Sequence, residues 1–400
     1  MFILIQCYCL FSHYSFFTTY SHILGILLRG IQHRVDSSIN TIHFSLRSHH
    51  GLMAFRSLPS TYYYQVSNAS ERQIPILMDS FTYCENNHLH LDAVFNLRYL
   101  SSDKQQFLNN PISASFHGET VDNSIGRDHH KHVILSSFVF NSSCSSRDSE
   151  FSIKIPNVTD SYVFVAPYAP KPEQPMYYLS MCTSISSVPL SLVRSWMEYH
   201  LANGIEHITI YANDMHSYWK DQLHEYIEIG VLSLLEFSYI HHLSFLEQQV
   251  ALSSCNRRYR RVSKFVIFND VDEFFMPINP EMRVIDVVKQ YDQLYPNADS
   301  FQVNSAFVAC RQWDFNNTLD IESICNKVGP IITTMRQKMI VNPLRVPFVQ
   351  VHMVTGASMI KVNYTTDMFF VHWKRKVSVQ AVNEYRINES VKKRLNESSL

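Results

Sequence analysis

A short apolar segment that ends in two acidic residues most constrains what this chain can fold into. Residues 265–268 are four large apolar side chains in a row, which is the length and composition of a strand buried on both faces. Asn269 breaks the run, and Asp270 and Asp272 follow it. In sheets covered by helices, ligands bind at the carboxyl ends of the strands. The segment therefore predicts an α/β sheet with two carboxylates at its binding edge.

The spacing of Asp270 and Asp272 suits one divalent cation, which prefers oxygen ligands and keeps open positions for substrate phosphates. Asp also begins many solvated turns, so the motif alone leaves both interpretations open. The residues that follow, 274–276, are apolar and indicate that the chain returns into a core. Carboxylates held between two buried segments need a partner, which favours a metal site and, with it, a nucleotide-diphosphate ligand.

Strand and helix patterns alternate before this segment. Apolar runs at 178–184, 208–211 and 231–235 predict strands, and apolar residues at helical spacing lie between them. The first helical pattern begins at Pro189, ends at Asn203-Gly204, and carries Trp196 and His200, which we interpret as core residues. This order of β, α, β, α, β, α and β predicts a doubly wound α/β domain.

Three more patterns follow the acidic segment. Residues 284–291 predict a helix, and residues 300–307 predict one strand. Residues 368–372 predict a strand that ends in His372, whose imidazole can bind a metal, although a lone histidine at a strand end is common without any function. Residues 386–400 are charged and predict a flexible tail, so the α/β domain is expected over 176–385.

The residues before the α/β pattern divide into three regions. Residues 2–28 are mostly apolar and long enough to span a membrane, although Gln6, His13, Ser15 and His22 interrupt them, and we favour a signal-anchor over 1–30; a cleaved signal peptide and a wrongly assigned N-terminus are the alternatives. Arg29 and Arg34 follow this run, and positive residues beside a membrane span favour the cytosolic side. They therefore argue against an orientation that places the rest of the chain in the lumen. Residues 31–60 predict a stem or linker. Residues 61–175 predict a small β-rich domain, in which the histidine cluster 128–132 lacks a ligand spacing and is interpreted as a solvated loop.

Composition excludes several functions and indicates a compartment. The net charge of −1 provides no electrostatic footprint for nucleic acid, and the chain has no glycine-rich dinucleotide or P-loop motif. The eight cysteines include no Cys-x-x-Cys pair, which argues against structural zinc; Cys310 and Cys325 are close enough in sequence to pair in an oxidising compartment. Seven Asn-x-Ser/Thr sites favour a lumenal or secreted protein, although an Asn- and Ser-rich composition produces some by chance.

Residues 178–376 resemble glycosyltransferase family 92, a group of galactosyltransferases with the GT-A fold. The resemblance rests on blocks that occur in the expected order: Met181-Cys182, residues 196–200 with Gly204, residues 208–211, Tyr226 with Gly230-Val231, Gln249, residues 255–258, residues 263–277, residues 337–343, Val351-His352 and residues 370–374. The chain departs from the family pattern at two places. It has Ser253-Ser254 where the family tends to have Asn-Asp, and Trp373-Lys374 where the family tends to have Tyr-Arg.

The resemblance implies a GT-A type, Rossmann-like nucleotide-sugar domain and a metal-dependent, inverting transfer of galactose from UDP-galactose to a glycan acceptor. It also implies a single-pass type II Golgi membrane protein with a lumenal catalytic domain, anchored through its N-terminal segment. Asp272 would bind Mn²⁺ or Mg²⁺ directly, Asp270 would bind the ion through water or hold the ribose, and His372 would be the third ligand. Asp314, next to Trp313, is the candidate base. The predicted uridine pocket is lined by polar residues at the ends of two strands: Thr183, Ser184, Tyr211 and Asn213. The alternative is that these residues are polar only because they lie next to loops.

Two other functions remain open. A catalytically inactive lumenal glycan-binding protein on the same fold is supported by the departures from the family pattern. An aspartate-nucleophile phosphatase also uses Asp-x-Asp after an apolar strand, but it normally continues to a threonine, where this chain has Phe274.

Overall fold

A computed structural model describes most of the chain between residues 63 and 374. The described ranges are 63–65, 73–75, 77–96, 112–122, 124–127, 133–142, 144, 149–154, 162–169, 172–186, 188–212, 216–236, 245–279, 281–309, 327–332, 336–354 and 357–374. The predicted signal-anchor, stem and tail, the histidine cluster 128–132 and the pair Cys310 and Cys325 lie outside them. Within these ranges no helix is both long enough and apolar enough to cross a membrane.

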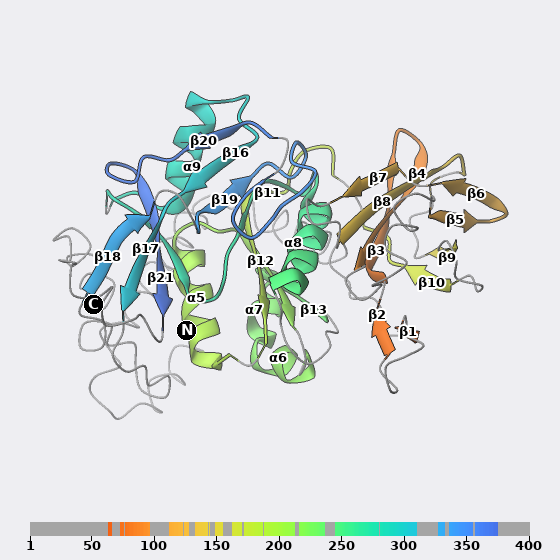
Figure 1. Cartoon of the computed structure of the whole chain (residues 1–400), viewed down its shortest axis with the longest axis horizontal. Coiled ribbons are helices and arrows are strands. Elements are labelled where there is room, and N and C mark those ends of the chain that lie inside the picture. Colours follow the sequence, from red (N-terminus) through yellow and green to blue (C-terminus); the bar gives the residue numbers. More distant parts are fainter. Residues whose placement is uncertain are drawn as a thin grey trace, which may run out of the picture.

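The α/β part is built on a seven-stranded sheet with the order β13-β12-β11-β14-β19-β16-β20 (Figure 1). The first four strands in this order are parallel, β19 is antiparallel to both of its neighbours, and β20 is parallel to β16. The strands are β11 (Tyr177–Ile185), β12 (His207–Ala212), β13 (Leu232–Glu236), β14 (Ser263–Phe268), β16 (Ser300–Val303), β19 (Lys338–Val341) and β20 (Met359–Lys361).

Helices connect the parallel strands and cover the sheet, as the alternating sequence patterns predict. They are α5 (Leu190–Ala202), α6 (His216–Gln222), α7 (His224–Glu228), α8 (Phe245–Tyr259) and, after the acidic segment, α9 (Val284–Leu294). The predicted stripe of α9 is buried, because Val284, Ile285, Val288 and Tyr291 all face the core. The chain is therefore a mixed α/β protein in this region, in agreement with the doubly wound prediction.

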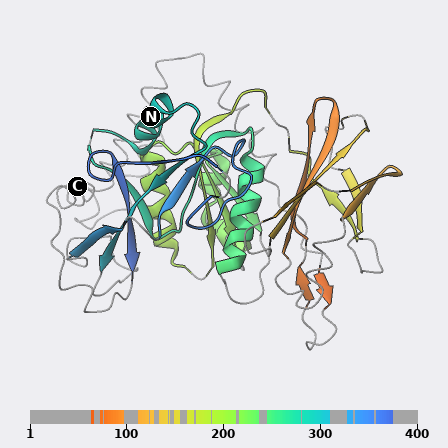
Figure 2. The same cartoon turned by 45° about the horizontal axis from the view of Figure 1, so that its top comes forward.

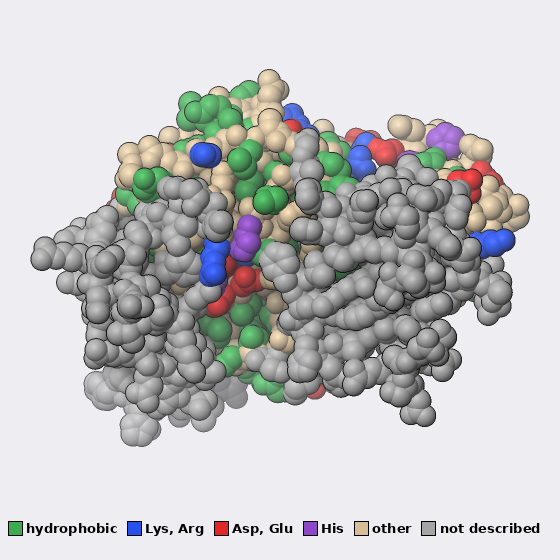
Figure 3. Space-filling view, viewed as in Figure 1, with side chains coloured by type: hydrophobic (Ala, Val, Ile, Leu, Met, Phe, Trp, Pro, Cys, Tyr) green, Lys and Arg blue, Asp and Glu red, His purple; other side chains and the backbone are tan. Residues whose placement is uncertain are grey.

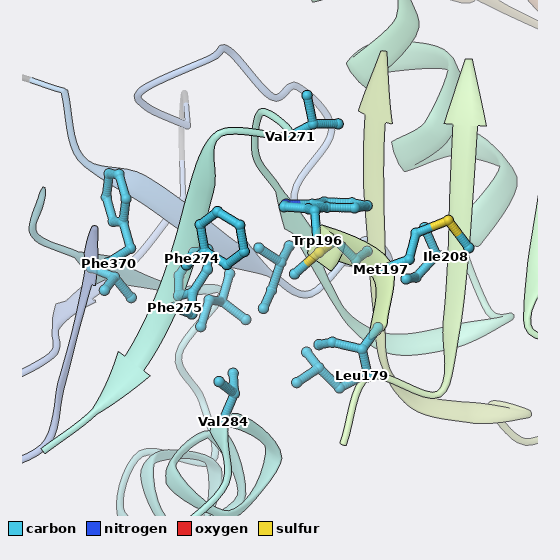
Figure 4. Packing of buried hydrophobic residues seen from close by; sticks show 14 of the residues in the cluster. Leu179, Trp196, Met197, Ile208, Val271, Phe274, Phe275, Val284 and Phe370 are labelled. Carbon is cyan, nitrogen blue, oxygen red and sulfur yellow. The ribbon is translucent and has the colours of Figure 1, made fainter. Parts of the chain in front are cut away.

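The predicted core residues of α5 are confirmed. Trp196 and His200 are both fully buried, and the Trp196 ring lies near Val271 and Phe274 in the main hydrophobic core (Figure 4). The helix ends at Ala202 with Asn203 as its C-cap, and Gly204 follows with a φ of +89°. A Cβ atom added at Gly204 would lie 2.3 Å from Cγ2 of Ile285, so the close packing of α5 against α9 also requires a glycine there.

A second, four-stranded sheet lies beside the first, with the order β15-β21-β17-β18. Its strands are β15 (Glu273–Pro277), β17 (Ser305–Ala309), β18 (Lys327–Ile332) and β21 (Met368–Lys374). The prediction of one strand over 300–307 is wrong, because the chain leaves the first sheet at Asn304 and enters the second as β17. Both halves mix apolar and small or amide side chains in the same way, so local patterning does not show where a strand changes sheets.

The N-terminal region is rich in β-structure, as predicted. A hairpin, β1 (Tyr63–Gln65) and β2 (Gln73–Pro75), precedes two four-stranded sheets. One has the order β3-β4-β8-β7 and the other β10-β9-β5-β6, and their facing sides share one core that includes Leu91, Phe138 and Phe151. The strands are β3 (Leu77–Glu85), β4 (His88–Asn96), β5 (Ser113–Phe116), β6 (Glu119–Asp122), β7 (Ser124–Arg127), β8 (Val133–Phe140), β9 (Ser149–Lys154) and β10 (Tyr162–Ala166). A disulfide joins Cys84 to Cys144.

Helix α8 lies between the two parts of the molecule (Figures 1 and 2). One side of it packs on the seven-stranded sheet, to which the disulfide Cys182–Cys255 ties it, and the other side packs on β4 and β8. The basic residues at its end reach acids of the β3–β4 hairpin: Arg257 with Asp92, Arg258 with Asp79 and Arg261 with Glu85. The basic cluster thus joins the two parts of the chain.

Candidate functional site

The acidic segment lies where β11 and β14 end, at the carboxyl edge of the parallel strands. Phe268 is the register partner of Cys182, and the backbone N–H of Asn269 donates to the carbonyl of Cys182 at 3.3 Å. The next residues of β11, Thr183 and Ser184, therefore reach the same edge as Asp270. The predicted placement of the carboxylates at this edge is what the structure shows.

The segment then turns back as β15, and hydrogen bonds to the backbone carbonyl of Glu273 fix this turn. Trp196 Nε1 and Asn269 Nδ2 both donate to the carbonyl oxygen of Glu273, at 3.1 and 3.0 Å. The N–H of Glu273 donates to the carbonyl of Asp270 at 3.1 Å. The two carboxylates of the motif thus lie on a short loop whose conformation is fixed from the buried side.

Strand β21 brings His372 to this loop. β15 and β21 are antiparallel, and Glu273 is the register partner of His372. Nε2 of His372 lies 3.3 Å from Oδ2 of Asp272, whose side chain is 37% exposed. Nδ1 of His372 lies 3.6 Å from Oε1 of Glu273. Acidic, histidine and basic side chains gather at one place near the middle of the face in Figure 3.

A buried lysine neutralises the other two carboxylates. Nζ of Lys338 lies 2.9 Å from Oε2 of Glu273 and 3.2 Å from Oδ2 of Asp270. Gln248, on α8, donates from Nε2 to the other oxygen of Asp270. The backbone N–H of Asp270 donates to Oε2 of Glu273 at 2.9 Å. Asp270 is therefore held on both of its oxygens, and Asp272 is the more open carboxylate of the motif.

The charges of this cluster are strongly coupled. Burial raises the pKa of Glu273 to about 7 although Lys338 opposes the shift, and the neighbouring Asp270 and Asp272 raise it further. Burial also disfavours the ionised form of Asp270, but Lys338 outweighs this and lowers the pKa of that carboxyl. Burial works against the charge of Lys338, and the two carboxylates reverse the effect and raise its pKa. The negative charge therefore resides on Asp270 more readily than on Glu273.

The solvent-facing side of the cluster offers two of the protein ligands that a divalent cation needs, Asp272 and His372. In the portion of the chain that the structure describes, no three His, Cys, Asp or Glu side chains are grouped so that they could hold a metal ion. Asp272 and His372 nevertheless place a carboxylate oxygen and an imidazole nitrogen 3.3 Å apart, which is the separation of two neighbouring ligands on one ion. The pair fits an ion that takes its remaining ligands from a bound phosphate and water.

The residues predicted to line a uridine pocket divide into three groups. Thr183 is buried, and its hydroxyl makes no hydrogen bond to the described part of the chain; Ser184 is half-buried at the same edge. Tyr211 differs from the prediction, because its ring is buried against α8 and its hydroxyl lies 2.8 Å from Oγ of Ser254. Tyr211 lies at the strand end as expected, but its side chain points toward α8 and not toward the carboxyl edge of the sheet. Asn213 and the candidate base Asp314 lie outside the described residues.

Sequence reasoning missed three contributors to the site. Glu273 directly follows the Asp-x-Asp motif, and Lys338 is a charged residue at the start of the apolar strand β19; both are unusual enough to signal a buried ion pair. Gln248 carries no such signal, since a glutamine on a helix is ordinary.

Comparisons with known proteins concern the α/β part of the chain, which contains this site. The sequence profile of glycosyltransferase family 92 matches residues 177–399, which include the acidic segment, Lys338 and His372. None of the curated proteins matches the chain.

Two solved structures each cover 55% of this chain and 99% of their own chain. HddC from Yersinia pseudotuberculosis, complexed with GMP-PN, shares 13% identity at a TM-score of 0.25. The nucleoside-diphosphate-sugar pyrophosphorylase from Vibrio cholerae RC9 shares 6% identity at a TM-score of 0.23. At these scores the likeness carries no argument about fold or activity.

Proposed function

Since the chain belongs to glycosyltransferase family 92, we propose that it transfers galactose from UDP-galactose to a hydroxyl group of a glycan, with inversion at the sugar carbon. The observation that carries the proposal is the approach of Asp272 Oδ2 to His372 Nε2, at 3.3 Å, on the carboxyl edge of the parallel strands. That edge is where open α/β sheets bind their ligands. A carboxylate and an imidazole that face outward there are suited to a nucleotide diphosphate with its cation.

Asp272 and His372 would hold the cation, and the imidazole favours Mn²⁺ over Mg²⁺. When bound, such an ion neutralises charge on the diphosphate as it leaves. Asp270 is fixed by Lys338 and Gln248, so it is suited to orient the donor through a hydrogen bond to the ribose. Ser184, half-buried at the same edge, is suited to contact the uridine, and the buried Thr183 lies behind it. Asp314 stays the predicted base that takes the proton of the acceptor hydroxyl.

We also propose a lumenal, oxidising compartment, with residues 1–30 as the membrane anchor of a type II Golgi protein. Support comes from the disulfides Cys84–Cys144 and Cys182–Cys255, which persist in oxidising compartments. Two of the glycosylation sequences, at Asn141 and Asn363, are exposed on the surface, where an attached glycan can be accommodated.

The test measures the hydrolysis of UDP-galactose, and the transfer of its galactose to a glycan, by the detergent-solubilised full chain in Mn²⁺ and in EDTA. We expect wild-type activity that EDTA abolishes, and a loss of at least about 100-fold in Asp272→Ala, because one of two cation ligands is gone. Asp286→Ala is the matched control: this partly exposed acid in the first turn of α9 pairs with Arg283, just before the helix, and should leave activity unchanged. A wild-type protein that neither hydrolyses nor binds UDP-galactose, yet retains a glycan, would instead indicate a glycan-binding protein.

A further inference from the structure

Lys338 is an unusual residue to bury, and its surroundings explain how it is tolerated. Its side chain is 1% exposed, and it extends from β19, the strand next to β14 in the sheet. A buried ammonium is strongly unfavourable unless charged partners surround it. Here the partners are two carboxylates from one loop, Glu273 at 2.9 Å and Asp270 at 3.2 Å. One positive charge therefore bridges two acids whose backbones lie three residues apart.

This bridging is the arrangement in which adjacent carboxylates normally hold a divalent cation. Both acids accept further bonds that fix them around the ammonium: Asp270 from Gln248, and Glu273 from the backbone N–H of Asp270. Oε1 of Glu273 is buried and makes no hydrogen bond within the described part of the chain. The cluster thus has the ligands and the enclosure of an inner cation position, with the ammonium of Lys338 in it.

We propose that Lys338 is a built-in cation, which permanently occupies the position between Asp270 and Glu273 and so keeps a divalent ion out of it. Its role is that of a positioning residue, since it is buried and acts through the two carboxylates. A consequence, which rests on the proposed function, is that an exchangeable ion can bind only on the outer side, between Asp272 and His372. Lys338 thereby separates an orienting carboxylate, Asp270, from a metal-binding one.

Removal of the lysine side chain should convert the inner position into a divalent-cation site. Lys338→Ala leaves two carboxylates facing a space that opens toward solvent beside Asp270, whose side chain is 31% exposed. Ca²⁺ is the appropriate probe, because it binds carboxylate oxygens and tolerates irregular geometry. The experiment uses an Asp272→Ala background, so that the outer pair is silenced and the result does not depend on the proposed function.

The measurement is the thermal midpoint of the full chain, in EDTA and in saturating Ca²⁺, without nucleotide and at mildly alkaline pH. We expect Lys338→Ala to unfold at a lower temperature in EDTA and to recover by about 5 °C with Ca²⁺, whereas the Asp272→Ala parent shows no such rise. Adding Glu273→Gln should abolish the Ca²⁺ response, because only one carboxylate then remains. Lys264→Ala, which breaks a partly exposed pair with Asp292, is the matched control and should not respond to Ca²⁺.

A Lys338→Ala protein whose midpoint is the same in EDTA and in Ca²⁺, or a Lys264→Ala protein that responds equally, overturns the proposal. If Lys338→Ala does not fold in EDTA, the variant that also carries Glu273→Gln shows whether the lysine is needed for its charge or for its packing. We expect this variant to be recovered as folded protein, since it removes the repulsion between the two acids. A variant no better than Lys338→Ala alone means that the lysine is needed for packing and not for charge, which also overturns the proposal.

Discussion

Arg258 on α8 and Asp79 on β3 form a buried ion pair that joins the α/β part of the chain to the N-terminal β-sheets, with Arg258 Nε 2.7 Å from Asp79 Oδ2. Ser254 donates to the same carboxylate, and Tyr211 lies behind Ser254 with its hydroxyl at 2.8 Å. The guanidinium also lies over the ring of Phe81. The N-terminal region is therefore bound to α8 by charge and packing together.

Loss of this pair should destabilise the protein strongly. We expect Asp79→Ala to lower the free energy of unfolding by about 3–5 kcal/mol, because it leaves the buried guanidinium without a partner. Glu85→Ala breaks the neighbouring but partly exposed pair with Arg261 and should cost only about 0–1 kcal/mol. Chemical denaturation measures both. Equal losses in the two variants would contradict the assignment of Arg258–Asp79 as the main link.

Gly204 is expected to tolerate no side chain. Gly204→Ala places a Cβ 2.3 Å from Cγ2 of Ile285 and keeps a residue with a side chain at a φ of +89°. The two effects together should cost about 2–5 kcal/mol. Gly118 has a similar φ, +84°, but nothing within 4 Å of the added Cβ, so Gly118→Ala should cost only about 1–2 kcal/mol. Thermal or chemical denaturation of the two variants separates steric overlap from backbone strain.

His200 should make the fold sensitive to acid. Burial lowers its pKa from 6.5 to about 3, although the hydrogen bond from Nδ1 to the carbonyl of Trp196, at 2.8 Å, opposes the shift. The folded protein thus keeps His200 neutral while the unfolded chain takes up a proton below pH 6.5, so stability is present above that pH and is lost as pH falls toward 3.

Between pH 7.5 and 5 the loss attributable to His200 is about 2 kcal/mol. His200→Phe keeps an aromatic ring beside Phe274 and removes the titration, so its stability should fall less over this interval. Urea denaturation at both pH values measures the difference. His207 has a similarly lowered pKa and is present in both proteins, so it cancels in the comparison. Parallel losses in the wild type and the variant would remove His200 as the cause.

His372 should govern divalent-cation affinity. If Asp272 and His372 hold Mn²⁺, His372→Ala should weaken Mn²⁺ binding in the presence of UDP by at least about tenfold, since even the partners of metal ligands change affinity by that amount. Electron paramagnetic resonance of free Mn²⁺ measures this without reference to turnover. His224→Ala, on an exposed helix, is the control. Unchanged Mn²⁺ affinity in His372→Ala would leave Asp272 as the sole protein ligand.

Local patterning accounts for the elements but not for their partners. The apolar run before Asn269, the stripe of α9 and the stop at Gly204 are properties of neighbouring residues, and each appears where the sequence predicts it. The prediction of a single strand over 300–307 is wrong because it also used only neighbouring residues. The composition of this segment suits either sheet, and only the pairing of β16 with β19 and of β17 with β21 distinguishes its two halves. The ion pairs of Arg258 and Arg261 with Asp79 and Glu85 depend on the packing of β3 near the end of α8, which no local pattern in the sequence shows.

The sequence by itself determined an α/β alternation, a buried strand that ends in two carboxylates, and a resemblance to glycosyltransferase family 92, because each depends on residue types at short spacing or in a fixed order. Tertiary structure alone decided that Lys338 neutralises Asp270 and Glu273, and that Tyr211 is buried against α8. The resemblance already implied that Asp272 and His372 share one ion, and the structure supplied the pairing of β15 with β21 that brings them to 3.3 Å. These contacts join strands and helices far apart in the chain. Their charges and distances follow from sheet order and register, which short-range spacing does not encode.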